Sequence, residues 1–216
     1  NNVVSSGTAV SSSIAAENTT RESRGSLYCY GTLAPAATLA LTLGLGLDHE
    51  DNAFRKGVEL DPKLGLRWAL APSTALRLAA IRTLQRPLAN GQTLEPTQVA
   101  GFNQFFEDEQ ATRAWRYGIG LDHRASASLF LGVEAGWRDL DFPSRVFGDS
   151  ASLGNHAQEW TVRAFGNWTP DARWALRSEI AFERFDYDLA CPSAGDLRAI
   201  DTARWTTGAR YFLPYG

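Results

Sequence analysis

The side chains in this sequence that could do chemistry are arginines and glutamates placed one position out of step with runs of apolar residues. Guanidinium groups bind carboxylates and phosphates, and walls of mixed charge set selectivity in aqueous channels. The pattern predicts either a passage or site for anionic solutes, or ladders of ion pairs that only fill a narrow interior. The residues predicted to line this interior are Arg67, Arg77, Arg116, Glu134, Arg138, Arg163, Arg177, Glu179, Glu183 and Arg210.

Two Asp-His neighbours are the candidates for catalysis, because omptin-like proteases use such a pair with further acidic residues at the extracellular rim of a barrel. Asp48 and His49 lie near the end of one expected strand, and Asp122 and His123 near the end of another. Adjacent residues of a strand point to opposite faces, so neither pair can act together. We therefore expect no enzyme and no catalytic residues.

Metal ions, cofactors and nucleic acid are not indicated as ligands. The chain has 2 cysteines and 3 histidines, which are scattered and have no zinc-ligand spacing. The Gly-x-Gly runs at 44–46 and 118–120 lie inside expected strands, not in phosphate-binding loops. The formal net charge of −3 gives no attraction to nucleic acid. Cys29 is expected in a strand and Cys191 in a loop, so a disulfide and two unpaired thiols remain alternatives.

Amphipathic strands are the elements that must position these charges. Every second residue is apolar from Leu129 to Trp137, and again from Trp160 to Trp168. This period of two predicts strands with one apolar and one polar face. Eight residues span roughly 26 Å along a strand, or about 20 Å at a ~40° tilt, close to the apolar band of an outer-membrane barrel. Similar segments are expected at 24–34, 39–48, 63–70, 76–81, 115–122, 174–183 and 205–213.

The apolar face is predicted to meet lipid, because its tryptophans resemble the aromatic girdles of membrane barrels. An arginine facing lipid at mid-depth costs ~2–4 kcal/mol, so the charged face should enclose the interior. The alternative is a soluble β-sandwich or lipocalin-like barrel, in which the apolar face points inward. The predicted girdle consists of Trp68, Trp115, Trp137, Trp160, Trp168, Trp174 and Trp205.

The connections between the expected strands alternate in length. Short turns fall near positions 35, 72, 125 and 170, and long loops near 54, 98, 149 and 194. Outer-membrane barrels have short periplasmic turns and longer extracellular loops. The sequence thus predicts an all-β, antiparallel transmembrane β-barrel of about 9–10 strands. Residues 1–23 are expected to be a weak first strand or a disordered leader, and 24–216 the barrel or the C-terminal part of a larger one.

One long connection carries the only helical signal. Pro96 could lie in the first turn of a short helix that starts near Thr93. Phe102, Phe105 and Phe106 would then share one side of the helix. These rings could form a constriction in the interior, contact a ligand or cap the mouth, or the loop could pack against itself.

Several segments resemble the barrels of TonB-dependent receptors. The run Leu60–Trp68 contains the P-x-L-G-L strand opening of these receptors, and the next strand leads into a loop with Arg86 and Pro87, similar to their R-x-P loop. The run Leu94–Pro96 is similar to their L-x-P-E loop motif, with the Glu before the Pro, and Tyr117–Leu121 resembles the strand that follows. The chain is also similar to the C-terminal barrels of large outer-membrane proteins that carry tetratricopeptide repeats upstream.

The likeness extends over residues 24–216, with several departures. The sequence shows no plug domain and no TonB box, and it is too short for the roughly 22 strands of a receptor barrel. The resemblance therefore implies a receptor-like barrel wall but not energy-coupled uptake. The last six residues, from Tyr211 onwards, are aromatic and near a strand end, as signals for the assembly machinery are.

These observations predict a porin-like protein of the Gram-negative outer membrane. Its barrel is expected to form all or part of a passage for a hydrophilic, and in one version anionic, solute or exported polymer. The alternative is a closed structural or anchoring barrel whose extracellular loops or missing upstream domain bind a partner. The expected partners are the lipid bilayer, the barrel assembly machinery and an upstream periplasmic domain or partner protein.

Overall fold

The computed structural model describes residues 23–51, 56–85, 95–105, 108, 111–145, 152–189 and 197–213. Nine strands form one sheet in the order β1-β2-β3-β4-β7-β8-β9-β10-β11, and β5 and β6 form a separate hairpin. Every pairing is antiparallel, which confirms the predicted fold class. The strands are β1 Ser23–Ala36, β2 Leu39–Asp51, β3 Lys56–Ala71, β4 Thr74–Leu84, β5 Gln98–Val99, β6 Phe102–Asn103, β7 Arg113–Arg124, β8 Leu129–Arg145, β9 Ser152–Trp168, β10 Trp174–Asp188 and β11 Ala199–Tyr211.

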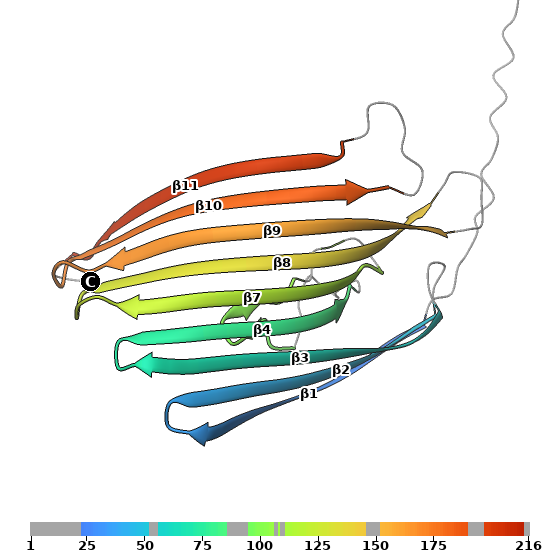
Figure 1. Cartoon of the computed structure of the whole chain (residues 1–216), viewed down its shortest axis with the longest axis horizontal. Coiled ribbons are helices and arrows are strands. Elements are labelled where there is room, and N and C mark those ends of the chain that lie inside the picture. The colour runs from blue at the N-terminus through green and yellow to red at the C-terminus, as the bar shows by residue number, and fades with distance from the viewer. Residues whose placement is uncertain are drawn as a thin grey trace, which may run out of the picture.

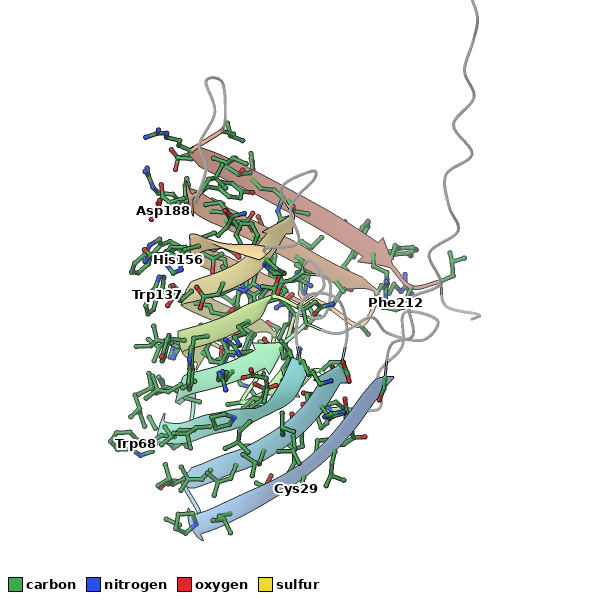
Figure 2. All side chains as sticks on the ribbon, turned by 90° about the vertical axis from the view of Figure 1, so that its right-hand side faces the viewer. Cys29, Trp68, Trp137, His156, Asp188 and Phe212 are labelled. Carbon is green, nitrogen blue, oxygen red and sulfur yellow. The ribbon has the colours of Figure 1, made fainter. Side chains whose placement is uncertain are left out.

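The sheet is a curved, open arc whose edge strands are β1 and β11 (Figures 1 and 2). The tight turns 37–38 and 72–73 lie together at one end of the strands (Figure 1), and by the strand bounds the connections 125–128 and 169–173 lie at the same end. At the other end, the connections 85–112, 146–151 and 189–198 are longer, as predicted, but β2 and β3 are joined through 52–55 alone. The long loop predicted near position 54 is therefore wrong, because β2 and β3 both extend into that segment. Within the described part of the chain, no helix is long and apolar enough to cross a membrane.

The two faces of the sheet have opposite chemistry. Leu131, Val162 and Ile180, which a soluble fold would bury, are 41%, 49% and 47% exposed. Arg77 and Glu134, on the other face, are buried at 8% and 7% exposure. The apolar residues therefore form the outer surface of the arc and the charged residues its inner surface, which we call the polar wall.

The outer apolar band ends at a ladder of stacked aromatic rings, after which the polarity of the faces reverses. Trp137 stacks on Trp160 of the next strand, with ring centroids 5.7 Å apart. Beyond this level the outer positions of β8 and β9 are polar, as His156 shows with its contact to Asp139 (3.0 Å from Nε2 to Oδ1). The inner positions there become apolar, and Ala114, Leu140 and Ala157 form a buried cluster.

This reversal explains why the strands extend further than predicted. The sequence analysis ended the strand of Trp137 at Arg138, but β8 continues to Arg145 and β9 begins at Ser152. The apolar alternation does not stop there but changes face, because the strands leave the apolar band and continue beyond it.

A hairpin stands where the sequence predicted a helix. Among residues 95–105 the regular elements are β5 and β6, joined by Ala100 (φ 50°) and Gly101 (φ 86°). Positive φ at both central residues is the condition for a type I′ turn, which joins antiparallel strands and ends any helix. Val99 and Phe102 flank this turn and are both 0% exposed. The predicted helix start at Thr93 and the ring of Phe106 lie outside the described residues.

Candidate functional site

Glu134 on β8 is the centre of the charges on the polar wall. Its Oε2 accepts hydrogen bonds from Arg77 of β4 (3.3 Å) and Arg163 of β9 (3.1 Å). Arg116 of β7 lies 4.0 Å from Oε1. Three guanidinium groups from three strands thus surround one carboxylate. Because all four residues alternate with apolar ones on their own strands, the antiparallel register brings them together on one face.

The network continues across β10 and β11. Glu179 is paired with Arg163 (3.6 Å), Arg177 (3.0 Å) and Arg204 (3.7 Å). Arg204 also lies 3.9 Å from Glu183. The sequence analysis missed Arg204 because it started the last strand at Trp205. Strand β11 begins at Ala199, and the same alternation extended toward that end would have found Arg204.

A second carboxylate that the sequence analysis did not select is Asp122. Arg77 donates to it from Nε (2.8 Å) and Nη2 (3.1 Å). Its neighbour His123 contacts Thr74 at 3.0 Å instead. Adjacent Asp and His therefore diverge, as expected, and Asp122 belongs to the ion-pair network.

The β5–β6 hairpin folds onto the polar wall and packs against glycines. A Cβ at Gly118 would lie 2.5 Å from the ring of Phe102, and one at Gly65 would lie 2.8 Å from Val99. The Phe102 ring also lies 4.9 Å from the guanidinium carbon of Arg77. The strand glycines therefore make a seat for the hairpin, a role that their sequence spacing did not reveal.

A buried ion pair holds the base of this hairpin. Lys63 of β3 pairs with Glu95, and their side chains are 3% and 5% exposed. The hydroxyl of Tyr30 donates to Glu95 (2.6 Å) and accepts from Gln104 (3.0 Å). Side chains of β1 and β3 therefore hold the two ends of the hairpin segment, at Glu95 and Gln104, against the sheet.

Phe105, at the end of the hairpin, covers two further predicted residues. Its ring centroid is 4.5 Å from the guanidinium carbon of Arg116 and 4.2 Å from that of Arg138. Arg138 also donates to Glu159 at 2.7 Å and contacts Asp108. The sequence analysis left several positions open for these rings, and the structure places Phe102 and Phe105 against the inner wall.

Two hollows of the polar wall are lined in part by residues of the hairpin segment. The first lies at the hairpin tip and is lined by Ala40, Thr42, Arg67, Arg77, Ala100, Gly101, Asp122, Phe130, Arg163 and Phe165. The second is lined by Asn103, Phe105, Arg116, Glu134, Gly136, Arg138, Glu159, Thr161, Arg163, Glu179, Ala181, Glu183 and Arg204. Arg163 borders both hollows, so one side chain links the two sites.

Three predicted lining residues, Arg67, Arg177 and Arg210, are exposed on the polar wall. The predicted girdle residues lie on the outer face at different levels. The ladder of Trp137 continues onto β7. The ring centroid of Tyr117 lies 5.3 Å from that of Trp137, and the centroid of Trp115 lies 5.8 Å from that of Tyr117. Near the tight turns lie Trp68, Trp168 and Trp174, and Trp205 lies in mid-strand opposite Ile180. Figure 2 shows Trp68 and Trp137 on the outer side of the arc.

Metal-binding groups of three or more His, Cys, Asp or Glu residues do not occur in the described ranges. Cys29 is exposed, with a free thiol, on the outer face of β1 opposite Leu45. Cys191, the other cysteine of the two alternatives considered above, lies outside the described residues.

No family model and no curated protein matches this sequence. Among solved structures, a mutant of the ferric enterobactin receptor of Pseudomonas aeruginosa is 16% identical, with a TM-score of 0.47 over 90% of this chain and 38% of that one. The siderophore receptor PirA of the same organism is 12% identical, with a TM-score of 0.44 over 89% of this chain and 49% of that one. The chain thus spans less than half of either structure. These likenesses concern the arrangement of strands, and what those receptors bind is not carried over.

Proposed function

We propose that this chain forms a wall of a bacterial outer-membrane β-barrel through which a hydrophilic solute passes. The proposal rests on one observation, the reversed polarity of the sheet. Leu43, Ile119 and Val133 are 46%, 52% and 52% exposed on the outer face. In water this apolar surface would drive aggregation, whereas in a bilayer it is the expected contact with lipid chains.

The aromatic ladder at one limit of the outer band supports the same placement. Tryptophan and tyrosine rings favour the membrane interface, where an apolar ring body and a polar edge are both accommodated. Polar outer residues such as Asp139 and His156 then lie beyond the hydrocarbon. By the usual asymmetry of these barrels, the tight turns face the periplasm and the longer connections the exterior.

The barrel needs strands in addition to those described. Unpaired backbone groups at an open sheet edge cost several kcal/mol each in hydrocarbon. Nine strands alternate in direction from β1 to β11, so the two edge strands run the same way. Antiparallel closure therefore requires an odd number of further strands between them.

The hairpin acts in this proposal as a constriction. It stands on the inner face, and its buried side chains Val99 and Phe102 have no role in contact with lipid. Arginines from several strands lie on either side of it, in the two hollows. A solute that moves along the wall would pass the tip at Ala100 and then the side chain of Arg163.

The alternative is a closed anchoring barrel, and the buried side chains of the polar wall favour it. Arg116 is only 9% exposed, and its Nε and Nη1 have no hydrogen-bond partner in the described structure. Ion pairs at this density are also what a filled, narrow interior would contain.

Conductance in planar bilayers separates the two functions. We expect the folded full chain, with whatever strands complete it, to give steady pores whose anion preference falls in Arg163→Ala, because Arg163 borders both hollows. Arg173→Ala is the matched control, since Arg173 lies in the turn before β10 and lines neither hollow. An absence of pores from correctly folded protein would select the anchoring barrel.

A further inference from the structure

Arg67 and Arg77 lie directly opposite each other on β3 and β4. Like charges in this position destabilise a sheet unless other groups compensate them. The charge of Arg77 is compensated by Asp122 and Glu134. Arg67 has no ion pair or hydrogen bond among the described residues, and it is exposed to the interior side. One cation of this pair is therefore left for an external partner.

A second arginine pair on the same wall shows what a compensated pair looks like. Arg116 and Arg138 also lie directly opposite each other, on β7 and β8. Phe105 covers both guanidinium groups, and Glu159 and Asp108 pair with Arg138. Both arginines border the second hollow, but Phe105 and the two carboxylates compensate them. Arg67 has no such protein partner and borders the hollow at the hairpin tip.

The hollow at the hairpin tip collects cationic groups. Its lining includes three arginines from β3, β4 and β9 and a single carboxylate, that of Asp122. Both oxygens of this carboxylate accept from Arg77, so it does not compensate Arg67. The side chain of Arg163 is 34% exposed and approaches from across the sheet. Arg163 is paired with Glu134 and Glu179, which lie outside this lining, so Arg67 is the cation of the hollow that no described carboxylate compensates.

We propose that this hollow binds an oxyanion of the phosphate class, held by Arg67 with help from Arg77 and Arg163. Guanidinium groups match the oxygen spacing of phosphate and donate two parallel hydrogen bonds to it. A doubly charged anion also removes the repulsion between Arg67 and Arg77. The inference rests on the proposed function, because it names a solute that the passage would hold.

The ligand would enter from the end with the tight turns. Arg67 and Asp122 border a further hollow at that end, together with Thr38, Pro72 and Arg124. The hairpin tip closes the other side of the site, where Gly101 lies so near to Arg77 that a Cβ would come within 2.8 Å of its Nη1. The site is therefore open on one side of the constriction.

Calorimetry with inorganic phosphate tests the site without any requirement for conductance. The folded full chain in detergent is titrated at constant ionic strength, with chloride as the comparison anion. We expect phosphate binding that weakens about tenfold or more in Arg67→Gln, the loss typical of one charged hydrogen-bond donor. Arg67→Lys should retain part of the affinity, because lysine keeps the positive charge but cannot donate the two parallel hydrogen bonds of a guanidinium group.

Arg173→Gln is the matched control for this measurement. Arg173 is an exposed arginine in the turn before β10, and it lines neither of the two hollows. Equal phosphate affinity in wild type and Arg67→Gln, or no phosphate binding in the wild type, overturns the inference. If phosphate binds but the protein forms no pores, the binding site stands and the proposed passage is rejected. If the protein forms pores but does not bind phosphate, the passage stands and the binding site is rejected.

Discussion

The ring of Phe102 lies over Gly118 so closely that a Cβ at Gly118 would be 2.5 Å from it. This contact joins a residue of the in-folded hairpin to the inner face of β7. Any side chain at Gly118 must either displace the ring or push the hairpin away from the wall. A substitution at Gly118 therefore tests the docking of the hairpin without changing the outer, lipid-facing side of β7.

We expect Gly118→Ala to release the hairpin while the sheet remains folded. The added methyl group occupies the place of the Phe102 ring, so the hairpin loses its seat. Limited proteolysis should then cleave within 95–105, and pore conductance should rise. Gly208→Ala is the control, because nothing lies within 4 Å of a Cβ there. Equal protection of the hairpin in both variants would contradict the described seat.

Two engineered cysteines, one at the hairpin tip and one on the polar wall, should form a disulfide. The Cβ of Ala100 lies 2.9 Å from the Cβ that a side chain at Gly65 would have. Disulfide-bonded Cβ atoms are about 3.5–4.5 Å apart, so a small shift suffices. We expect Gly65→Cys with Ala100→Cys, in a Cys29→Ser, Cys191→Ser background, to cross-link on oxidation, as peptide mass spectrometry would detect. A hairpin that stands away from the wall would leave both thiols free.

Removal of one partner of the buried Lys63–Glu95 pair should loosen the hairpin base. We expect Lys63→Met to destabilise docking by about 3 kcal/mol, because it leaves Glu95 buried without its cation. The measurement is hydrogen exchange at the amides of 98–103, which should speed up while those of β8 do not. The double variant Lys63→Met, Glu95→Met should recover most of the protection. If the double variant is no better protected than the single one, the ion pair is not what holds the base.

The outer face should tolerate charge only beyond the aromatic ladder. We expect Val133→Arg, in the apolar band, to destabilise the protein in lipid vesicles by ~2–4 kcal/mol, the cost of an arginine near the bilayer midplane. Gln158→Arg, on the same face but beyond Trp160, should change stability little. Urea titration in vesicles measures both variants. Similar stability of the two would place the band at a different depth.

The alternation of apolar and polar residues was enough to predict the strands and their two faces. Each strand alternates by itself, so Leu131 and Arg163 could be assigned to opposite faces without knowledge of their neighbours. The positions of the tight turns likewise follow from turn residues such as Pro72 and Asp171. Strands, their two faces and tight turns each depend on a few neighbouring residues, so a short stretch of sequence is enough to predict them.

The predicted helix at Pro96 failed because its evidence was local as well. Three phenylalanines at helical spacing are also compatible with a hairpin, and the choice depends on what the rings meet. Phe102 meets Gly118, which lies on a strand of the sheet and not in the loop itself. Burial on that seat stabilises the hairpin, and no spacing within the loop encodes it.

The sequence by itself determined antiparallel β-strands with an apolar face, a charged face and tight turns at one end, because each is a short-range property of the chain. Only the tertiary structure decided that Glu134 gathers Arg77, Arg116 and Arg163, and that the hairpin folds onto the polar wall. Those contacts join residues from separate strands, and they depend on the register between strands and on the space that glycines leave, neither of which a single strand specifies.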